Sequence, residues 1–387
     1  MIKTIGDGVK YIGIEDKTID LFESQYEVKF GVTYNSYVIL DEKVAIFETA
    51  DVRVTDEWKK LLVEALDGKT PDYLVVSHME PDHSSNVKTL IEMYPNITIV
   101  GNAKTFQLLS QFIRDRELTN TLVVKEGDIL DLGKHKLKIM LAPMVHWPEV
   151  MMEYDEYDKI LFSADAFGRF GPIETEYKWE DFARRYYFNI VGKYGPMVQK
   201  VLAAAANLDI KTIAPVHGPV LDKDLGHYIG LYQTWSSFKP EAKGVAIAYA
   251  SLHGNTKKFA KLVEEEFKKA GIDCRSFDLN REDLSEAVEY AFKFNKLLLA
   301  APTYDGGLAC PMKDFITRLE AKTWQQREVA LIENGSWGPL AAKKMRELLE
   351  GFKGVTIRDE VITIKSTPTK ENIDQINGLI EWAKNGN

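Results

Sequence analysis

Apolar runs change their spacing at residues 236–244, and this change is the feature that most constrains the fold. Beyond it, about 140 residues alternate between strand-like runs and helix-like stretches, the latter exemplified by 257–270 and 371–384. Such alternation is typical of a parallel sheet with helices on both faces. We therefore predict a doubly wound α/β domain over residues 244–387. Its strands are expected at 245–249, 275–279, 296–301, 328–332 and 355–362.

Residues 1–243 have a different pattern, in which short apolar runs dominate and a few helices intervene, such as 86–94. Many strands with few helices indicate a layered α/β sandwich. Pro240 and Gly244 mark the boundary, because both residue types interrupt regular structure. The acidic run 153–158 is interpreted as a solvated turn. The strands are expected at 36–40, 44–47, 73–76, 97–100, 137–141, 160–163 and 212–215.

Composition excludes several classes of function. A net charge of −9 argues against nucleic-acid binding, which requires a concentrated basic face. No apolar run approaches the roughly 18 residues that span a bilayer, and the first residues lack a signal-peptide core. Cys274 and Cys310 form no metal-spaced pair, and Cys310 is interpreted as a plain reduced thiol. These features predict a cytoplasmic protein that does not associate with membranes.

Histidines and carboxylates gather at predicted strand ends of the first domain. The run 78–83 reads H-x-E-x-D-H and follows a strand-like segment. Alternate residues of an extended chain share a side, so its members can point at one place before a helix that Ser84 or Ser85 caps. Imidazoles and carboxylates together supply the ligands of two metal ions. The seven predicted ligands are His78, Glu80, Asp82, His83, His146, Asp165 and His217.

Each of these residues alone is more often structural than metal-binding, and a lone Asp after a strand is usually a turn residue. Their joint occurrence in this order, ending in a Pro-x-His-Gly string at His217, weakens that interpretation sharply. The remaining histidines, His135, His227 and His253, lack such a context and are not assigned to metal.

Three loops at predicted strand ends of the second domain indicate a cofactor site. The first, 251–256, opens a helix, and backbone N–H groups there can hold one phosphate group. Small residues in the other two loops let the backbone approach a planar ring, and an aromatic side chain can pack on it. No G-x-G-x-x-G fingerprint occurs, which favours FMN over FAD or NAD. The candidate residues are Ser251, His253, Gly254, Asn255, Thr256, Pro302, Thr303, Tyr304, Asp305, Gly306, Asn334, Gly335, Ser336, Trp337 and Gly338.

The ligand order resembles the metallo-β-lactamase superfamily, whose hydrolases usually carry H-x-H-x-D-H and bind zinc. Here Glu80 replaces the middle histidine, and with the string 146–149 the chain resembles the flavodiiron proteins. The resemblance implies an αββα metallo-β-lactamase-like sandwich followed by a flavodoxin-like, FMN-binding sheet. It implies one iron on His78, Glu80 and His146, a second on Asp82, His83 and His217, and Asp165 as the bridge. His83 is the ligand that varies within the family.

The resemblance also implies an activity and partners. A flavodiiron protein reduces O2 to water, NO to nitrous oxide, or both, with electrons passing through FMN. No rubredoxin-type C-x-x-C pair follows the second domain, so a separate rubredoxin-like protein or a reduced deazaflavin is expected as donor. A head-to-tail homodimer, or a dimer of such dimers, is expected, and residues 20–23 are expected near the gas pocket.

Two alternatives stay open at this point. A dizinc hydrolase of the same sandwich fold, fused to a flavodoxin, differs from the leading interpretation at Glu80 and predicts hydrolysis without a reductant. An electron carrier with a vestigial metal site predicts FMN without bound metal, although all seven candidate ligands have metal-binding side chains.

Overall fold

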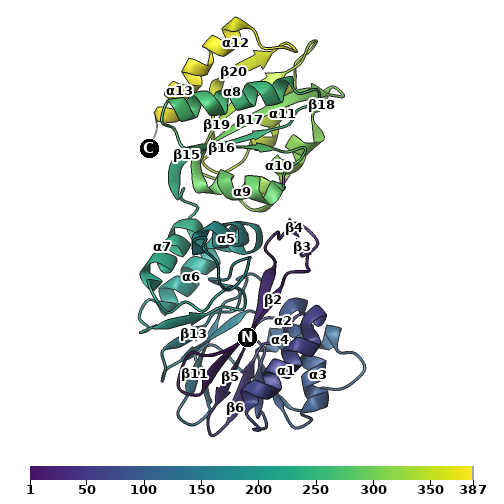
Figure 1. Ribbon diagram of the computed structural model, residues 1–387, viewed down its shortest axis with the longest axis vertical. Coiled ribbons are helices and arrows are strands. Elements are labelled where there is room, and N and C mark those ends of the chain that lie inside the picture. The colour runs from purple at the N-terminus through teal and green to yellow at the C-terminus, as the bar shows by residue number, and fades with distance from the viewer. Residues whose placement is uncertain (386–387) are drawn as a thin grey trace. The chain divides into compact units, whose positions relative to one another are not determined.

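The computed structural model describes residues 1–385 and divides the chain into two compact units, Met1–Gln233 and Thr234 onward (Figure 1). Each unit has its own sheets and its own buried core. Among the described residues, no helix is long and apolar enough to cross a lipid bilayer.

The first unit is a sandwich of two sheets. In the larger sheet, seven strands run in the order β1 (Ile2–Thr4), β2 (Val9–Asp16), β5 (Val32–Leu40), β6 (Val44–Phe47), β7 (Tyr73–Val75), β8 (Thr98–Gly101) and β9 (Thr121–Val123). The smaller sheet has the order β10 (Ile129–Asp131), β11 (Lys136–Leu141), β12 (Met151–Asp155), β13 (Ile160–Phe162) and β14 (Thr212–Ala214). A short hairpin, β3 (Leu21–Phe22) and β4 (Tyr26–Glu27), follows β2.

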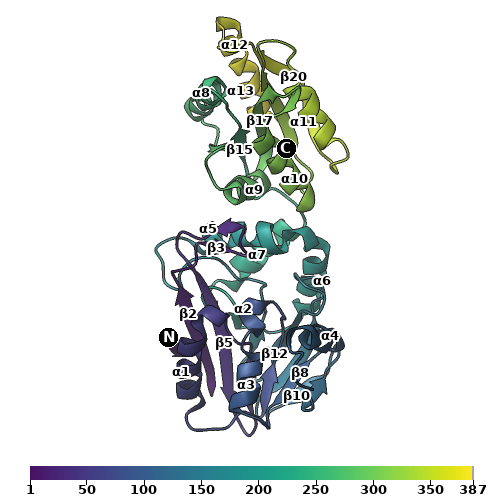
Figure 2. The same ribbon diagram turned by 90° about the vertical axis from the view of Figure 1, so that its right-hand side faces the viewer.

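Apolar side chains from both sheets meet in one buried cluster between them. Phe47 of β6 stacks on Phe162 of β13 with ring centroids 4.2 Å apart, so the two sheets share one core. Helices cover the outer face of the larger sheet, where α1 (Thr55–Leu66) packs on β2 and β5 and α4 (Ala103–Phe112) packs on β8 (Figure 2). The helices are α1 (Thr55–Leu66), α2 (Pro81–Ser84), α3 (Val87–Met93), α4 (Ala103–Phe112), α5 (Trp179–Tyr186), α6 (Gly195–Ala205) and α7 (Leu225–Ser236).

The second unit is a parallel sheet in the order β16 (Cys274–Asp278), β15 (Ala242–Tyr249), β17 (Phe294–Tyr304), β19 (Glu328–Asn334) and β20 (Thr356–Ile364). Counted along the chain this order is 2-1-3-4-5, the flavodoxin-like arrangement. One face packs on α8 (Asn255–Lys269) and α13 (Ile376–Lys384). The other face packs on α9 (Leu284–Lys293) and α11 (Ala341–Leu349), with α10 (Cys310–Ala321) beside them.

The predicted α/β fold classes are confirmed for both units, and three local predictions are wrong. Residues 153–155 belong to β12, and Glu153 and Asp155 have no exposed surface, so only the end of the acidic run is a turn. The expected helix at 371–384 is interrupted after Asp374, giving α12 (Lys370–Asp374) and α13. The third error concerns the helix after His78, which begins at Pro81.

That helix, α2, contains Asp82 and His83 instead of beginning after them, and Glu80 precedes its first turn. Neither predicted serine cap forms: Ser84 Oγ donates to the Met79 carbonyl at 2.8 Å, and Ser85 Oγ donates to the Pro81 carbonyl. Pro81 favours an early helix start because its fixed φ suits the first helical position. Asp82 therefore lies in a helix, whereas His78 and Glu80 lie in the irregular segment before it, and Glu80 has extended backbone angles.

Candidate functional site

The seven predicted metal ligands lie together in the first unit, beyond the carboxyl ends of its strands. The run 78–83 follows β7 in the larger sheet, whereas Asp165 and His217 follow β13 and β14, which pair in parallel in the smaller sheet. His146 comes from the loop between β11 and β12. Both sheets thus contribute to one end of the sandwich, where ligand sites of α/β folds form.

The side chains divide into two groups that can each hold one metal ion. His78, Glu80, His146 and Asp165 place one ligand atom each within 4.8 Å of one another, and Asp82, His83 and His217 do the same.

Asp165 faces both groups. Its Oδ2 lies 3.1 Å from His78 Nε2 and 3.4 Å from His146 Nε2, and its Oδ1 lies 3.6 Å from His83 Nε2 and 3.7 Å from His217 Nε2. A carboxylate in this position can bridge two metal ions.

Several of these polar atoms are buried without a hydrogen-bond partner, which is the observation that tests whether metal ions fit. Buried polar groups in proteins are nearly always hydrogen-bonded, so a cluster of exceptions requires a cause. Here the donor set itself, nitrogen and oxygen ligands around two points, fits a pair of metal ions. Within residues 1–385, the buried atoms without a hydrogen bond are both carboxylate oxygens of Asp82, both ring nitrogens of His83, Asp165 Oδ2 and His217 Nε2.

The carboxylates make this pocket attractive to cations. Burial by itself lowers the pKa of His83, but Asp82 and Asp165 outweigh it and raise that pKa to about 9. For His146, burial is likewise outweighed by Asp165 and Glu80, and its pKa also rises to about 9. The same negative charge that retains protons on imidazoles favours divalent or trivalent metal ions.

Two histidines are oriented by partners on their second ring nitrogen. His78 Nδ1 donates to Glu149 Oε1 at 2.9 Å, and the same oxygen accepts the Met79 N–H at 2.8 Å. His217 Nδ1 donates to the Thr33 carbonyl at 2.6 Å. Each bond leaves the Nε2 lone pair directed at the site, as in most protein metal centres. Glu149 was not predicted as a site residue, although its position three residues after His146 was an available signal.

A pair of buried carboxyl groups lies behind His78. Glu48 Oε1 accepts the backbone N–H groups of Ser77 and His78 at 2.6 and 3.1 Å. The Ser77 hydroxyl donates to Glu153 Oε2 at 3.0 Å. Burial raises the pKa of Glu48 to about 7 and, together with the Glu48 charge, raises the pKa of Glu153 well above its ordinary value. These groups fix the backbone that presents His78.

Tyr186, at the last position of α5, donates its hydroxyl hydrogen to Asp165 Oδ1 at 2.7 Å and is buried. No local motif marked this tyrosine. Phe22 of β3 packs edge-on against the His217 ring at 5.5 Å. The prediction that residues 20–23 lie near the pocket is therefore correct for Phe22.

Some of the strained backbone positions lie beside this site. Glu48 and Ala164, the residue before Asp165, have φ of +55° and +48°, and Met144 and Phe167 both have φ of +66°. Left-handed conformations of residues other than glycine cost energy and are enriched at functional sites.

The second unit contains a pocket of about 630 Å³ at the carboxyl ends of β15, β17, β19 and β20. Fourteen of the fifteen residues predicted to bind a cofactor line it; the exception, Gly254, lies at the start of α8 with φ of +91°. Leu252 and Ser366 also line it and were not predicted. Ser366 belongs to a fourth loop, after β20, which lacks any glycine-rich signal.

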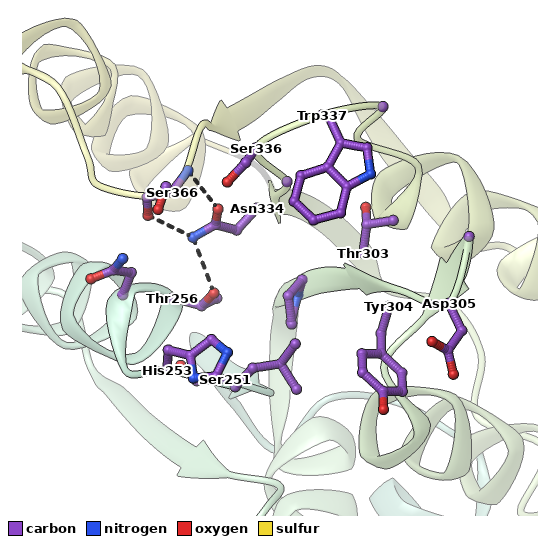
Figure 3. Close-up of a pocket in the computed structure, with 16 residues that line it drawn as sticks. Ser251, His253, Thr256, Thr303, Tyr304, Asp305, Asn334, Ser336, Trp337 and Ser366 are labelled. Carbon is purple, nitrogen blue, oxygen red and sulfur yellow. Dashed lines mark hydrogen bonds between the residues drawn. The ribbon is translucent and has the colours of Figure 1, made fainter.

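One side chain connects three of these loops (Figure 3). Asn334 Nδ2 donates to the Ser366 carbonyl at 3.0 Å and to Thr256 Oγ1 at 3.4 Å, while its Oδ1 accepts the Ser366 N–H at 3.0 Å. On the other side of the pocket, Tyr304 and Trp337 expose 47 % and 87 % of their surfaces. The pocket thus has a hydrogen-bonded polar wall and a wall of two exposed aromatic rings, which suits a planar ring with a polar tail.

Comparison with known families supports the two-unit division. Residues 32–218 match the ODP family beta lactamase model, and residues 246–351 match a flavodoxin domain model.

Curated relatives extend over both regions. A nitric oxide reductase of Moorella thermoacetica is 29 % identical over 96 % of this chain and 95 % of its own length. A putative diflavin flavoprotein A of Nostoc sp. is 31 % identical over 92 % of this chain; the chain spans 63 % of that relative's length.

Solved structures have the same fold. The flavodiiron protein of Giardia intestinalis superposes with a TM-score of 0.92 at 24 % identity, over 99 % of this chain and 96 % of that one. Rubredoxin oxygen:oxidoreductase of Desulfovibrio gigas superposes with a TM-score of 0.91 at 24 % identity, over 98 % and 97 %. The protein joins a metallo-β-lactamase-like domain to a flavodoxin-like domain, and it belongs to the flavodiiron protein family, oxidoreductases with a di-metal site and a flavin.

Proposed function

We propose that this oxidoreductase reduces O2 to water, NO to nitrous oxide, or both, at a diiron centre supplied with electrons through FMN. The observation that carries the proposal is the position of Asp165, whose two oxygens face the two groups of ligands separately. Such an arrangement could hold two metal ions in one pocket, where two NO molecules, or both atoms of O2, would be kept close together for reaction.

The donor set supports iron. We assign His78, Glu80 and His146 to one ion, Asp82, His83 and His217 to the other, and Asp165 to both. Three carboxylates with four imidazoles suit an ion that must be stable in ferric and ferrous states, whereas hydrolytic zinc sites are richer in imidazole. When bound, the two iron ions supply redox equivalents and Lewis acidity at the gas.

The protein's own residues hold, orient and shield this centre. Glu149 and the Thr33 carbonyl fix two imidazole rings, and Tyr186 holds one oxygen of Asp165. Of the ligand side chains, Glu80, Asp82 and His146 retain exposures of 13 %, 9 % and 9 %, whereas His78, His83, Asp165 and His217 retain none. Small gases would therefore approach past the three partly exposed ligands.

We assign the diiron centre to residues 1–243 and FMN to residues 244–387. The pocket volume of about 630 Å³ is in the range of small-molecule sites, and its loops occupy the flavodoxin switch point. The FMN residues are those predicted above, with Ser366 added.

The electron donor is proposed to be a rubredoxin-like protein or a reduced deazaflavin, and the location the cytoplasm. The name of the Desulfovibrio relative supports rubredoxin and O2, and the name of the Moorella relative supports NO. A head-to-tail homodimer, or a dimer of dimers, is proposed because closed two-fold assemblies are common and the resemblance described above implies one. A stable, fully active monomer in light scattering would exclude this assembly.

The decisive experiment is anaerobic reduction of the iron- and FMN-loaded protein by an artificial donor, followed by parallel measurement of O2 and NO consumption. Rapid loss of either gas supports the proposal, and the ratio of the two rates names the substrate. Loss of neither gas, with reduced iron and FMN verified spectroscopically, contradicts it. Hydrolysis of thioesters or phosphodiesters by a zinc-loaded sample without reductant would then favour the dizinc hydrolase.

A further inference from the structure

His253 is the only basic side chain among the residues that line the flavin pocket, and Asp305 is the only acidic one. The other polar groups of the lining are neutral hydroxyls, amides and backbone groups. His253 precedes Gly254, the N-cap residue of α8, and its side chain is exposed. Figure 3 shows it beside Ser251 and Thr256, on the side of the pocket away from Trp337 and Tyr304.

Backbone donors already converge beside this histidine. The N–H groups of Gly254 and Lys257 both donate to Ser251 Oγ, at 3.1 and 3.3 Å. Two N–H groups directed at one oxygen at the start of a fifteen-residue helix form the kind of cradle that accepts a phosphate oxygen. A phosphate monoester carries between one and two negative charges near neutral pH, which these neutral donors offset only in part.

Two lysines near the start of the same helix are engaged elsewhere. Lys257 Nζ lies 3.0 Å from Asp278 Oδ2, and Lys261 Nζ lies 3.1 Å from Glu264 Oε2. His253, by contrast, makes no hydrogen bond or ion pair within residues 1–385. Its imidazole is the one side chain of the lining that can bring a full positive charge to the cradle.

We propose that His253 is the phosphate-recognising cation of the flavin site, so that this protein binds the phosphorylated flavin most tightly when the imidazole is protonated. The proposal rests on the assignment of FMN to this pocket and adds the residue that selects FMN over riboflavin. Histidine is the cationic side chain that most readily gives up its charge, so we expect this selection to weaken as the pH rises, unlike selection by lysine or arginine.

The other charged groups around the loop do not reproduce this dependence. Lys257 and Asp278 form a pair, and Glu282 accepts the Asp278 N–H at 3.0 Å, so both carboxylates next to the loop are engaged. Asp305 lies on the opposite wall of the pocket in Figure 3. Lys365, on the loop after β20, is exposed, and the charge of a lysine does not change across neutral pH.

The test compares dissociation constants of FMN and riboflavin, from quenching of flavin fluorescence, at pH 6.5 and 8.5 in the metal-loaded protein. We expect FMN to bind about tenfold more weakly at pH 8.5, as for loss of one charge-assisted hydrogen bond, and riboflavin to be unaffected. In His253→Gln the dissociation constant of FMN should be the same at the two pH values. In His253→Lys, FMN should bind tightly at both. His227→Gln, on α7, is the matched control.

Three results would overturn the proposal. If His253→Gln keeps the wild-type pH dependence, a group other than His253 causes it and His253 does not recognise phosphate. If the protein binds FMN and riboflavin equally at both pH values, the role of His253 fails while the flavin assignment stands. If it binds neither flavin, the proposed FMN site itself fails, and the role of His253 with it.

Discussion

The two candidate sites solve the problem of holding a cofactor in opposite ways. At the metal site, His78, His83, Asp165 and His217 have no exposed surface, and several of their polar atoms make no hydrogen bond. In the flavin pocket the buried Asn334 and Thr256 bond to each other and Asn334 also bonds to Ser366, while Trp337 is 87 % exposed. Because unpaired buried polar groups are costly, bound ions would stabilise the first site, whereas the buried polar side chains Asn334 and Thr256 of the second are already paired.

This contrast predicts that a conservative change at a metal ligand has far larger consequences than one in the flavin loops. Asp165→Asn removes the charge that faces both groups of ligands and should reduce bound iron from two ions to fewer than one. Turnover should then fall by at least about a thousandfold, since the centre is lost and not merely perturbed. Elemental analysis with flavin quantification checks this. The control Asp115→Asn, at an exposed position, should retain two iron ions per chain. If Asp165→Asn also retains two iron ions, Asp165 does not bridge them.

The flavin pocket should respond more mildly to loss of the residue that connects its loops. Asn334→Ala removes the bonds to Thr256 and Ser366, each of which contributes about 0.5–1.5 kcal/mol. FMN should therefore bind roughly ten- to thirtyfold more weakly, while the iron content stays at two. Equilibrium titration of flavin fluorescence measures the change. Unaltered FMN affinity would mean that backbone interactions alone hold these loops. Asn372→Ala, on α12 of the same unit, is the comparison variant for FMN affinity.

A smaller effect is expected when the hydrogen bond from Tyr186 to the candidate ligand Asp165 is removed. Tyr186→Phe removes one charge-assisted donor but no ligand, which corresponds to about 1.5–3 kcal/mol at most. Iron should be retained, and turnover should fall about five- to tenfold with a shifted diiron reduction potential. Potentiometric titration distinguishes loss of the hydrogen bond to Asp165, which shifts the reduction potential, from a packing defect, which does not. The control Tyr94→Phe, at the end of the unrelated helix α3, should leave turnover and the reduction potential unchanged. If Tyr186→Phe and wild type have equal reduction potentials, Tyr186 does not position Asp165.

The parts of the molecule that were predictable are those encoded locally. Strand–helix alternation predicts the parallel sheet of the second unit, because apolar periodicity records which face of each element is buried. The candidate metal ligands were recognisable because imidazoles and carboxylates after strand ends are chemically conspicuous, and the structure brings all seven together. Neither signal depends on a distant partner.

What escaped prediction depends on partners far away in the chain. Tyr186 is an ordinary buried tyrosine until the fold brings it to Asp165, and Ser366 joins the flavin pocket only because Asn334 binds it. The acidic strand is the clearest case. Glu153 is buried because Ser77, 76 positions away, donates to it, and Asp155 because His135 does. A local pattern of carboxylates contains no record of such partners, so it was interpreted as solvent-exposed.

That buried acid leads to the smallest predicted effect. The folded-state pKa of Glu153 is raised by burial and by Glu48, whereas the unfolded chain loses its proton near pH 4.5. Between these values the unfolded state is the more ionised, so Glu153 destabilises the fold progressively as the pH rises above about 4.5. A glutamine side chain at this position cannot ionise but can still accept the Ser77 hydroxyl. Glu153→Gln should therefore match wild type at pH 4.5 and become more stable than it, by about 1 kcal/mol, towards pH 8. Thermal unfolding of the metal-loaded protein across this range measures the difference, with the exposed Glu156→Gln as control. A gap that stays constant with pH would show that Glu153 is ionised in the folded protein, and that a cation not apparent from its neighbours compensates it.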